Sequence, residues 1–349
     1  MKIAIDVSPL ETGHKIRGVG FYLQNLKDAL IKYHPEEQYF FFKDRSEIPK
    51  DTDIVHFPYF DPFFITLPFF KKHKTVVTVH DLTPIVFPEH FPAGIKGNFS
   101  WRIQKLNLSK TNAIITDSNS SNKDVGKYTG IPSEKIHTVY LAAGDEFKQL
   151  ENKTSKLEVI KKYNLPEKFV LYVGDVTWNK NLPRLVRTIK KTNIPLVMVG
   201  KSLVQANFDK TNIWNKDLIE IQKLTENDNQ FFKLGFVSGE DLVSLYNLAT
   251  ALILPSVYEG FGLPVLEAMQ SGCPVVTTKG GSISEVAGEA AYFVDGYNDE
   301  SIIEGIKKVF ADEKLQKELS RKGLVQAKKF SWEKTANKTI EIYNKVLSR

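Results

Sequence analysis

Short apolar runs alternate along this chain with longer segments in which apolar residues recur every three to four positions. The runs FVLYVG (169–174) and PLVMVG (195–200) are continuously apolar, as expected of strands buried on both faces of a parallel sheet. The segment from Tyr22 to Leu30 instead gathers its apolar residues on one side of a helix. This alternation predicts an α/β protein built on parallel sheets.

Two openings of strand, loop and helix indicate two domains. The first begins at Lys2 with KIAIDV, and the second follows a polar stretch, 148–156, that lacks apolar periodicity and is the predicted linker. A chain of 349 residues suits two domains of about 150 to 180 residues each. We therefore expect a Rossmann-like domain over 1–152, a second over 153–330 and a final helix over 331–349.

Composition and charge exclude some classes of protein. Apolar residues make up 42% of the chain and charged residues 25%, which is ordinary for a globular protein. No apolar run reaches the roughly 18 residues of a membrane helix, and the first residues lack a signal-peptide profile, so a cytoplasmic location is expected. The net charge of +6 is spread without a basic arm, which argues against nucleic-acid binding.

The densest candidate site is the segment EGFGLPVLE, 259–267. An apolar run precedes it, and Pro264 suits the first turn of the helix that follows. Gly260 and Gly262 allow the backbone to approach a ligand closely, and a helix N-terminus favours an anion such as phosphate. We place Glu267 in the first helical turn. It either contributes to a ligand site or only offsets the helix dipole.

The same segment, continued by AMQSGCPVV and TTKGGSISEVAGEAAYFVD, resembles the donor site of the retaining glycosyltransferases of family 4. Two Glu residues separated by seven others are characteristic of that family, and the resemblance covers nearly the whole chain. It implies the GT-B fold, in which two Rossmann-like parallel-sheet domains face a cleft and the C-terminal helix crosses back to the first domain. It also implies that Glu259 contacts the donor sugar, that the N–H groups of Phe261, Gly262 and Leu263 hold sugar or diphosphate oxygens, and that Glu267 holds the ribose.

The loop VGDVTWNKN opens the second domain and supplies a cation. Lys180 follows a predicted parallel strand near a helix N-terminus, which is a good position for a diphosphate contact. The family usually carries a second basic residue where this chain has Asp175 or Asn179. We therefore expect Lys180 to carry more of the charge, with Arg17 or Arg184 as helpers.

Two loops of the first domain also resemble the family. RGVGFYL, with Gly18 and Gly20, is similar to the glycine loop that lies over the donor diphosphate, where Arg17 either adds a charge or simply leads into a helix. The third glycine of a dinucleotide fingerprint is missing. VHDLTPIVFPEHFP resembles the loop in which a His approaches the donor sugar, so His80 is a candidate site residue; the alternative is a hydrogen-bonded structural His.

Two further stretches have open or discounted functions. Asp51 and Asp53 form an Asp-x-Asp triplet of the kind that holds a divalent cation in other glycosyltransferases, but no further oxygen ligands follow at a recognisable spacing, so no metal is expected. The aromatic and basic stretch 58–74 either rests on an anionic membrane and leads a lipid-linked acceptor to the site, or packs its rings into the domain.

Together these motifs predict a retaining hexosyltransferase that moves a sugar from a nucleotide-sugar donor to a hydroxyl of a glycan or lipid-linked glycan. The resemblance is nearest to mannosyl- and rhamnosyltransferases of surface polysaccharide assembly, which favours mannose from GDP-mannose. Glu259 and His80 are the expected catalytic residues, without a metal or other cofactor, and peripheral contact with the inner face of the membrane fits the acceptor. The alternatives are a GT-B sugar-nucleotide epimerase or hydrolase, or a non-catalytic glycan-binding protein.

Overall fold

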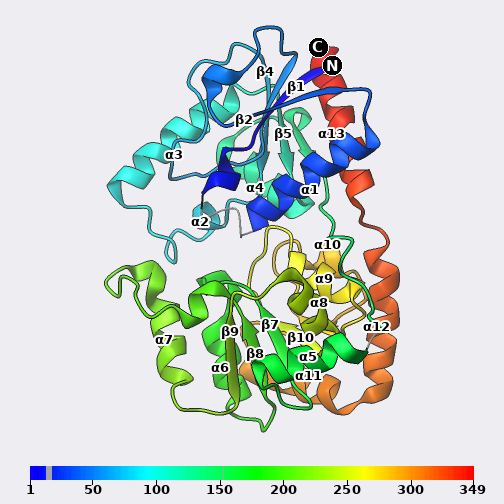
Figure 1. The fold of residues 1–349 in the computed structure, drawn as a ribbon. Helices are drawn as coiled ribbons and strands as arrows, with labels where there is room; N and C mark the ends of the chain where they lie inside the picture. The colour runs from blue at the N-terminus through cyan, green and yellow to red at the C-terminus, as the bar shows by residue number, and fades with distance from the viewer. Residues whose placement is uncertain (13–17, 152) are drawn as a thin grey trace. The chain divides into compact units, whose positions relative to one another are not determined.

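The computed structural model describes residues 1–12, 18–151 and 153–349 (Figure 1). The chain forms two compact units, the first made of Met1–Ala142 with Phe330–Arg349 and the second of Ala143–Lys329. Each unit contains one six-stranded sheet whose paired strands are all parallel. The predicted α/β class with two Rossmann-like parallel sheets is confirmed.

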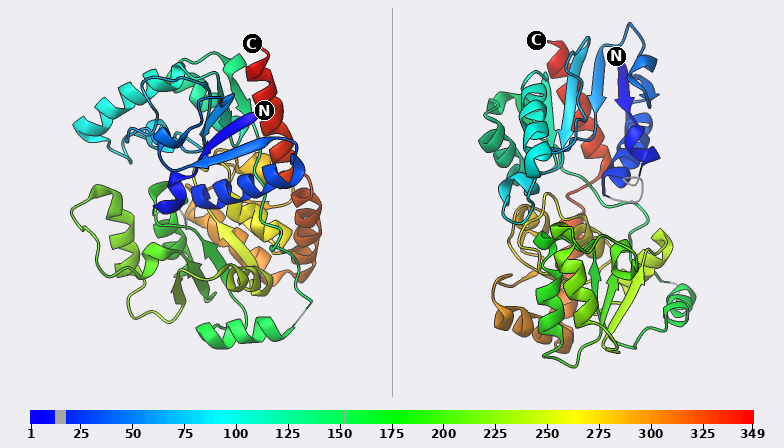
Figure 2. Two further views of the ribbon diagram at one scale, coloured as in Figure 1. Left: turned by 45° about the horizontal axis from the view of Figure 1, so that its top comes forward. Right: turned by 90° about the vertical axis from the view of Figure 1, so that its left-hand side faces the viewer.

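The sheet of the first unit has the strand order β2-β1-β3-β4-β5-β6. The crossover helices cover both of its faces, with α3 and α4 on one side and α1 and α13 on the other (Figures 1 and 2). The strands are β1 (Lys2–Asp6), β2 (Gln38–Phe42), β3 (Ile54–Phe57), β4 (Lys74–Val79), β5 (Ala113–Thr116) and β6 (Ile136–Thr138). The helices are α1 (Gly18–Tyr33), α2 (Thr83–Val86), α3 (Gly94–Ser109), α4 (Asn119–Thr129) and α13 (Trp332–Leu347), with short 3-10 turns η1 (Ser8–Glu11), η3 (Arg45–Glu47) and η4 (Ser133–Lys135).

The sheet of the second unit has the order β12-β11-β10-β7-β8-β9. Its strands are β7 (Val170–Val173), β8 (Leu196–Val199), β9 (Phe231–Gly235), β10 (Ala251–Leu254), β11 (Val275–Thr277) and β12 (Tyr292–Phe293). Every residue of β7, β8 and β10 is buried, as their continuously apolar sequences predict. Because β7 and β10 are neighbours, the loops that leave their carboxyl ends lie side by side, which is where ligands bind in open parallel sheets.

The helices of the second unit lie between and after these strands. They are α5 (Lys153–Tyr163), α6 (Leu182–Ile189), α7 (Lys216–Leu224), α8 (Gly239–Leu248), α9 (Leu263–Gln270), α10 (Ile283–Ala287), α11 (Asp299–Ala311) and α12 (Glu313–Ala327), with 3-10 turns η5 (Trp178–Lys180), η6 (Lys201–Val204) and η7 (Ile213–Asn215). In the part of the chain that the structure describes, no helix combines the length and the hydropathy needed to cross a membrane.

A buried polar network joins four elements of the first unit. The imidazole of His56 on β3 lies 2.6 Å from the Tyr343 hydroxyl of α13 through Nδ1, and 2.9 Å from Thr78 Oγ1 of β4 through Nε2. The Tyr22 hydroxyl of α1 is also 2.9 Å from Thr78 Oγ1. Burial, with a smaller contribution from the charge on His80, lowers the pKa of His56 to about 3, so its ring is neutral and both nitrogens need these partners.

We expect Tyr343→Phe to lower the free energy of unfolding by about 1–3 kcal/mol, because it leaves a buried imidazole nitrogen without its partner. Urea denaturation followed by Trp fluorescence measures the change. The matched control is Tyr297→Phe, since Tyr297 is 63% exposed and its hydroxyl can bond to water. Equal stability of the two variants would contradict a structural role for the network.

Candidate functional site

The loops after β7 and β10 bring Lys180 and Glu259 together although 79 residues separate them in sequence. Lys180 Nζ lies 2.7 Å from both carboxylate oxygens of Glu259. The side chains are only 18% and 8% exposed, so the pair is shielded from much of the solvent screening that weakens surface ion pairs. The structure thus unites two residues that the sequence analysis assigned to one donor site.

Backbone and side-chain hydrogen bonds hold the Glu259 loop in place. Ser256 Oγ donates to Glu259 Oε1 at 2.6 Å. Ser282 donates from its backbone N and from Oγ to the carbonyl of Glu259, both at 3.0 Å, and from Oγ to the carbonyl of Phe261 at 2.8 Å. Sequence reasoning missed both serines; the only signal was their place beside the Glu259 motif and in the later glycine turn GGS.

Two asparagines on either side of Lys180 fasten its loop to the Glu259 loop. Asn179 Nδ2 donates to the carbonyl of Tyr258 at 3.0 Å, and its own carbonyl accepts from Val257 N at 2.8 Å. Asn181, in the left-handed conformation with φ 56°, donates to the carbonyl of Pro255 at 3.1 Å. Asn179 therefore serves to join the two loops.

Helix α9 begins where the sequence predicts an anion site. Its N-cap residue is Gly262, whose φ of 97° lies in the region that favours glycine. Pro264 stands in the first turn, where its missing N–H costs nothing. The backbone N–H groups of this turn lie at the positive end of the helix dipole, and the contacts assigned to Phe261, Gly262 and Leu263 stay a prediction.

Glu267 is the fifth residue of α9 and lies in its second turn, so its predicted place in the first turn is wrong. Because the helix starts at Leu263, Glu267 is not in the first turn, where a carboxylate would offset the helix dipole. Glu267 Oε2 accepts a hydrogen bond of 2.8 Å from the buried Tyr246 hydroxyl. Burial raises the pKa of Glu267 to about 7; Glu146 adds to the increase, whereas the Tyr246 hydrogen bond and Lys180 oppose it.

In the first unit, His80 follows β4 and is held on both ring nitrogens. Nδ1 lies 2.6 Å from Asp117 Oδ2 and Nε2 lies 3.1 Å from the carbonyl of Pro58. The carbonyl of Pro58 can only accept, so Nε2 carries a proton, and the negative charge of Asp117 favours a second proton on Nδ1. Burial alone would lower its pKa, but the charge and hydrogen bond of Asp117 outweigh burial and raise it. Sequence reasoning missed Asp117, whose signal is its place directly after the neighbouring strand β5.

Gly18 and Gly20 lie in the first turn of α1, so the prediction that they form a loop before the helix is wrong. Gly20 is buried, and its lack of a side chain allows close packing there. Arg17, the proposed helper cation, lies outside the described residues. The other proposed helper, Arg184, donates to the carbonyl of Gly296 and pairs with Asp299 at 3.2 Å.

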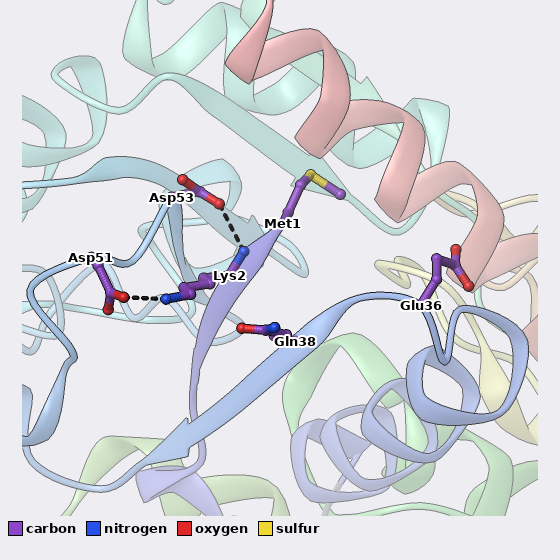
Figure 3. Close-up of a pocket in the computed structure, with 6 residues that line it drawn as sticks. All are labelled: Met1, Lys2, Glu36, Gln38, Asp51 and Asp53. Atoms are coloured by element: carbon purple, nitrogen blue, oxygen red, sulfur yellow. Dashed lines mark hydrogen bonds and ion pairs between the residues drawn. The ribbon is translucent and has the colours of Figure 1, made fainter.

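The acids of the Asp-x-Asp triplet have a structural partner in Lys2. Asp53 Oδ2 accepts a 2.8 Å hydrogen bond from Lys2 N, and Asp51 pairs with the Lys2 ammonium group (Figure 3). With Gln38 and Glu36 they line a surface pocket at the amino ends of the strands. This edge is opposite to the carboxyl edge at which parallel sheets bind ligands, and the acids hold the start of β1.

Two family models match the chain. The model of Glycosyltransferase Family 4 matches residues 16–143, and the model of Glycosyl transferases group 1 matches residues 155–326, which include Lys180, Glu259 and Glu267. The chain belongs to glycosyltransferase family 4. The predicted family and the predicted class of enzyme, a glycosyltransferase, are therefore confirmed.

Curated members of this family include two mannosyltransferases of Escherichia coli. O-antigen chain mannosyltransferase B is 29% identical over 328 residues, which are 91% of this chain and 80% of that protein. The serotype-specific mannosyltransferase WbdA is 28% identical over 285 residues, which are 78% of this chain and 34% of that protein. The match therefore spans about a third of the length of WbdA.

Solved structures of glycosyltransferases share the fold over nearly the whole chain, which confirms the predicted GT-B class. The structure of Anabaena HepE in complex with UDP and glucose superposes with a TM-score of 0.74 over 99% of each chain. Its sequence is only 16% identical to this family 4 glycosyltransferase, so the likeness concerns the fold.

We expect Gly281→Ala to disturb the Glu259 loop. Gly281 has a φ of 62°, and an added Cβ would stand 2.3 Å from the carbonyl oxygen of Glu259. Backbone strain and this clash should lower the free energy of unfolding by about 1–3 kcal/mol, which thermal unfolding measures. They should also displace Glu259, which a turnover assay detects as lost activity. Gly126→Ala is the control, because its Cβ would meet only Ile136 at 3.8 Å; similar losses in both variants would contradict the argument.

Glu267→Gln should change how stability depends on pH. The folded pKa of about 7 exceeds the ordinary value of 4.5, so the stability contributed by the protonated carboxyl is complete below about pH 4.5 and is lost as the pH rises through 7. Glutamine resembles the protonated acid and does not titrate. Between pH 5 and pH 8, the free energy of unfolding of the variant should therefore rise by about 2 to 3 kcal/mol relative to that of the wild type.

Urea denaturation of both proteins at pH 5 and pH 8 measures this difference. The control is Glu304→Gln, because Glu304 is an exposed residue of α11 and its replacement should give a nearly constant offset. A Glu267→Gln curve parallel to that of the wild type would show that the folded carboxyl titrates at its ordinary pKa.

Proposed function

We propose that this glycosyltransferase moves mannose from GDP-mannose, with retention of the anomeric configuration, to a hydroxyl of a glycan or lipid-linked glycan. The observation that carries the proposal is the buried pair of Lys180 and Glu259 beside the start of α9. Mannosyltransferase relatives support the choice of sugar. The UDP complex of HepE, a protein of the same fold, supports a nucleotide-sugar donor.

The pair of Lys180 and Glu259 suits a donor with a charged and an uncharged part. A bound diphosphate would compete with Glu259 for the Lys180 ammonium group, and the carboxylate would then be available to accept hydrogen bonds from sugar hydroxyls. The first turn of α9 adds N–H groups for the phosphate oxygens. Asp175 is acidic and accepts a hydrogen bond from Ser202 Oγ at 3.1 Å. Asn179 is neutral and joins the two loops. Neither residue therefore adds a cation to this group.

Glu267 is the proposed ribose contact. Its carboxyl group accepts from Tyr246 through Oε2, and two ribose hydroxyls would add donors to the same group. Hydrogen bonds to a carboxylate favour its charged form, so donor binding should lower the pKa of Glu267 from about 7. Tyr246 orients this carboxyl group and is a positioning residue in the proposal.

Stabilisation of the departing diphosphate and of an oxocarbenium-like sugar is the main catalytic task. Glu259 is paired and serves the sugar hydroxyls, so we assign the acceptor proton to an oxygen of the departing phosphate on the same face of the sugar. His80 remains the proposed contact in the first unit, as an imidazolium whose Nε2 would exchange Pro58 for a donor oxygen. The proposal includes no metal ion or other cofactor, in line with the pairing of Asp51 and Asp53 with Lys2.

The names of the relatives support the proposed acceptor. One relative is named an O-antigen chain mannosyltransferase and the other a serotype-specific mannosyltransferase, and these names support a glycan or lipid-linked glycan acceptor. A lipid-linked acceptor would hold the enzyme in the cytoplasm at the inner face of the membrane. A GT-B epimerase or hydrolase remains the second candidate, because it would use the same donor site without an acceptor.

Nucleotide release from GDP-, UDP- and dTDP-sugars, measured with and without glycan acceptors, tests the proposal. We expect release from GDP-mannose to depend on the acceptor. Lys180→Ala should lower turnover by about 10²-fold or more, as expected when a preorganised charge that stabilises the transition state is removed, and Glu259→Gln should also lower it strongly. Lys307→Ala, on the exposed side of α11, is the control.

Two outcomes would overturn the assignment. Equal turnover by Lys180→Ala, Glu259→Gln and the wild type would exclude the site. Release of free sugar that does not depend on an acceptor would favour the hydrolase.

A further inference from the structure

The first unit exposes large apolar side chains on α3 and on the loop before β4. Phe70 is 90% exposed and Ile95 is 91% exposed. Phe64, Phe69, Phe99 and Leu106 are between 50% and 71% exposed. Single exposed apolar residues are common, but a cluster on two adjoining segments is typical of an interaction surface.

Helix α3 exposes apolar residues on one side, although Leu108 of the same helix is buried in the core. Ile95, Phe99 and Leu106 are spaced by four and seven residues, which places them on one side of the helix, and that side is exposed. The buried side contains two polar residues, Gln104 and Asn107, beside Leu108, and all three are 0% exposed. A helix on a protein surface normally buries its apolar side and exposes its polar side, so the outer side of α3 needs an explanation.

The two buried amides attach the loop to α3. Gln104 Nε2 donates to the carbonyl of Asp61 at 2.9 Å and to Thr66 Oγ1 at 2.7 Å, and Gln104 Oε1 accepts from Leu67 N at 3.3 Å. Asn107 Nδ2 donates to the carbonyl of Leu67 at 3.4 Å, and Lys71 Nζ donates to the backbone carbonyl of Asn107 at 2.7 Å. Loop and helix therefore form one supported platform, and the exposed rings are held on it rather than on a loose segment.

This arrangement answers the question that the sequence left open about 58–74. Phe60 and Leu67 are buried in the core of the first unit, at 4% and 0% exposure. Phe64, Phe69 and Phe70 of the same stretch are exposed. The stretch thus both packs into the domain and presents rings outward, and α3, which the sequence analysis did not single out, extends the exposed surface.

The charge of the platform identifies a partner of complementary charge. Residues 62–74 and 91–110 contain seven Lys or Arg residues and neither Asp nor Glu. Lys72, Lys96, Arg102 and Lys110 are exposed. Basic residues beside exposed Phe, Ile and Leu match a bilayer that contains anionic lipids, where headgroups meet the cations and apolar side chains enter the boundary of the acyl chains.

We propose that α3 and the loop 62–72 dock this protein on an anionic lipid bilayer, with Phe70 and Ile95 as the main inserted side chains. The proposal does not depend on which sugar the enzyme transfers. Each apolar residue adds area removed from water, and each exposed cation near an anionic surface strengthens binding by about fivefold. A surface with only one of these features would bind such a bilayer weakly.

Co-sedimentation of the full chain with vesicles tests the proposal. We expect binding to vesicles of phosphatidylcholine mixed with phosphatidylglycerol, weak binding to phosphatidylcholine alone, and loss of binding at high salt. The double variant Phe70→Ser, Ile95→Ser should bind at least about tenfold more weakly. Both side chains are almost fully exposed, so their replacement should leave the fold and the release of nucleotide with a soluble acceptor unchanged.

Matched variants separate the contribution of the apolar side chains from that of the basic side chains. Lys72→Gln with Lys96→Gln should weaken binding to anionic vesicles and reduce its salt dependence. The control is Ile213→Ser with Val325→Ser, which removes apolar side chains of the second unit that are 59% and 57% exposed and should leave binding unchanged.

Three results would overturn the proposal. They are no binding to anionic vesicles, equal binding by the wild type and the Phe70→Ser, Ile95→Ser variant, or equal binding to neutral and anionic vesicles. Light scattering after gel filtration tests the competing occupant: a wild-type dimer that becomes a monomer in this variant, without vesicle binding, would assign the platform to a second copy of the chain.

Discussion

The ion pair between Lys180 and Glu259 depends on the order of strands in the second sheet. Because β7 and β10 are neighbours and parallel, the loops after them leave the same edge of the sheet at adjacent points. A largely buried ion pair is favourable only where geometry and further hydrogen bonds compensate for lost hydration. Here Lys180 contacts both carboxylate oxygens and Ser256 donates to one of them, so the compensation is local.

Neutral side chains hold the two loops that carry the ion pair. The asparagines at 179 and 181 donate to carbonyl groups of the Glu259 loop, and Ser282 supports that loop from the other side. These bonds fix the backbone around the ion pair without adding charge. An arginine at 179 would add a cation in place of the neutral amide that donates to the carbonyl of Tyr258. At position 179 the chain therefore has a loop contact rather than a charge.

Parts of the site could be predicted because they depend on local chemistry. Gly262 takes a positive φ directly before α9, as a glycine followed by Leu-Pro at a helix start suggests. Local patterns were less able to locate the ends of helices. α1 already includes Gly18 and Gly20, and α9 starts early enough to place Glu267 in its second turn. One residue of shift at a helix start changes which side chains belong to the first turn, and tertiary packing decides that shift.

The sequence by itself determined the buried strands, the α/β class, the family and the identity of the candidate site residues, because each of these is encoded in short contiguous patterns. Only the tertiary structure decided which residues are partners. Asp117 pairs with His80, Tyr246 donates to Glu267, and Gln104 joins α3 to the loop before β4. These pairs join segments 21 to 38 residues apart. Their burial and hydrogen bonds depend on which strands and helices become neighbours, which no local pattern specifies.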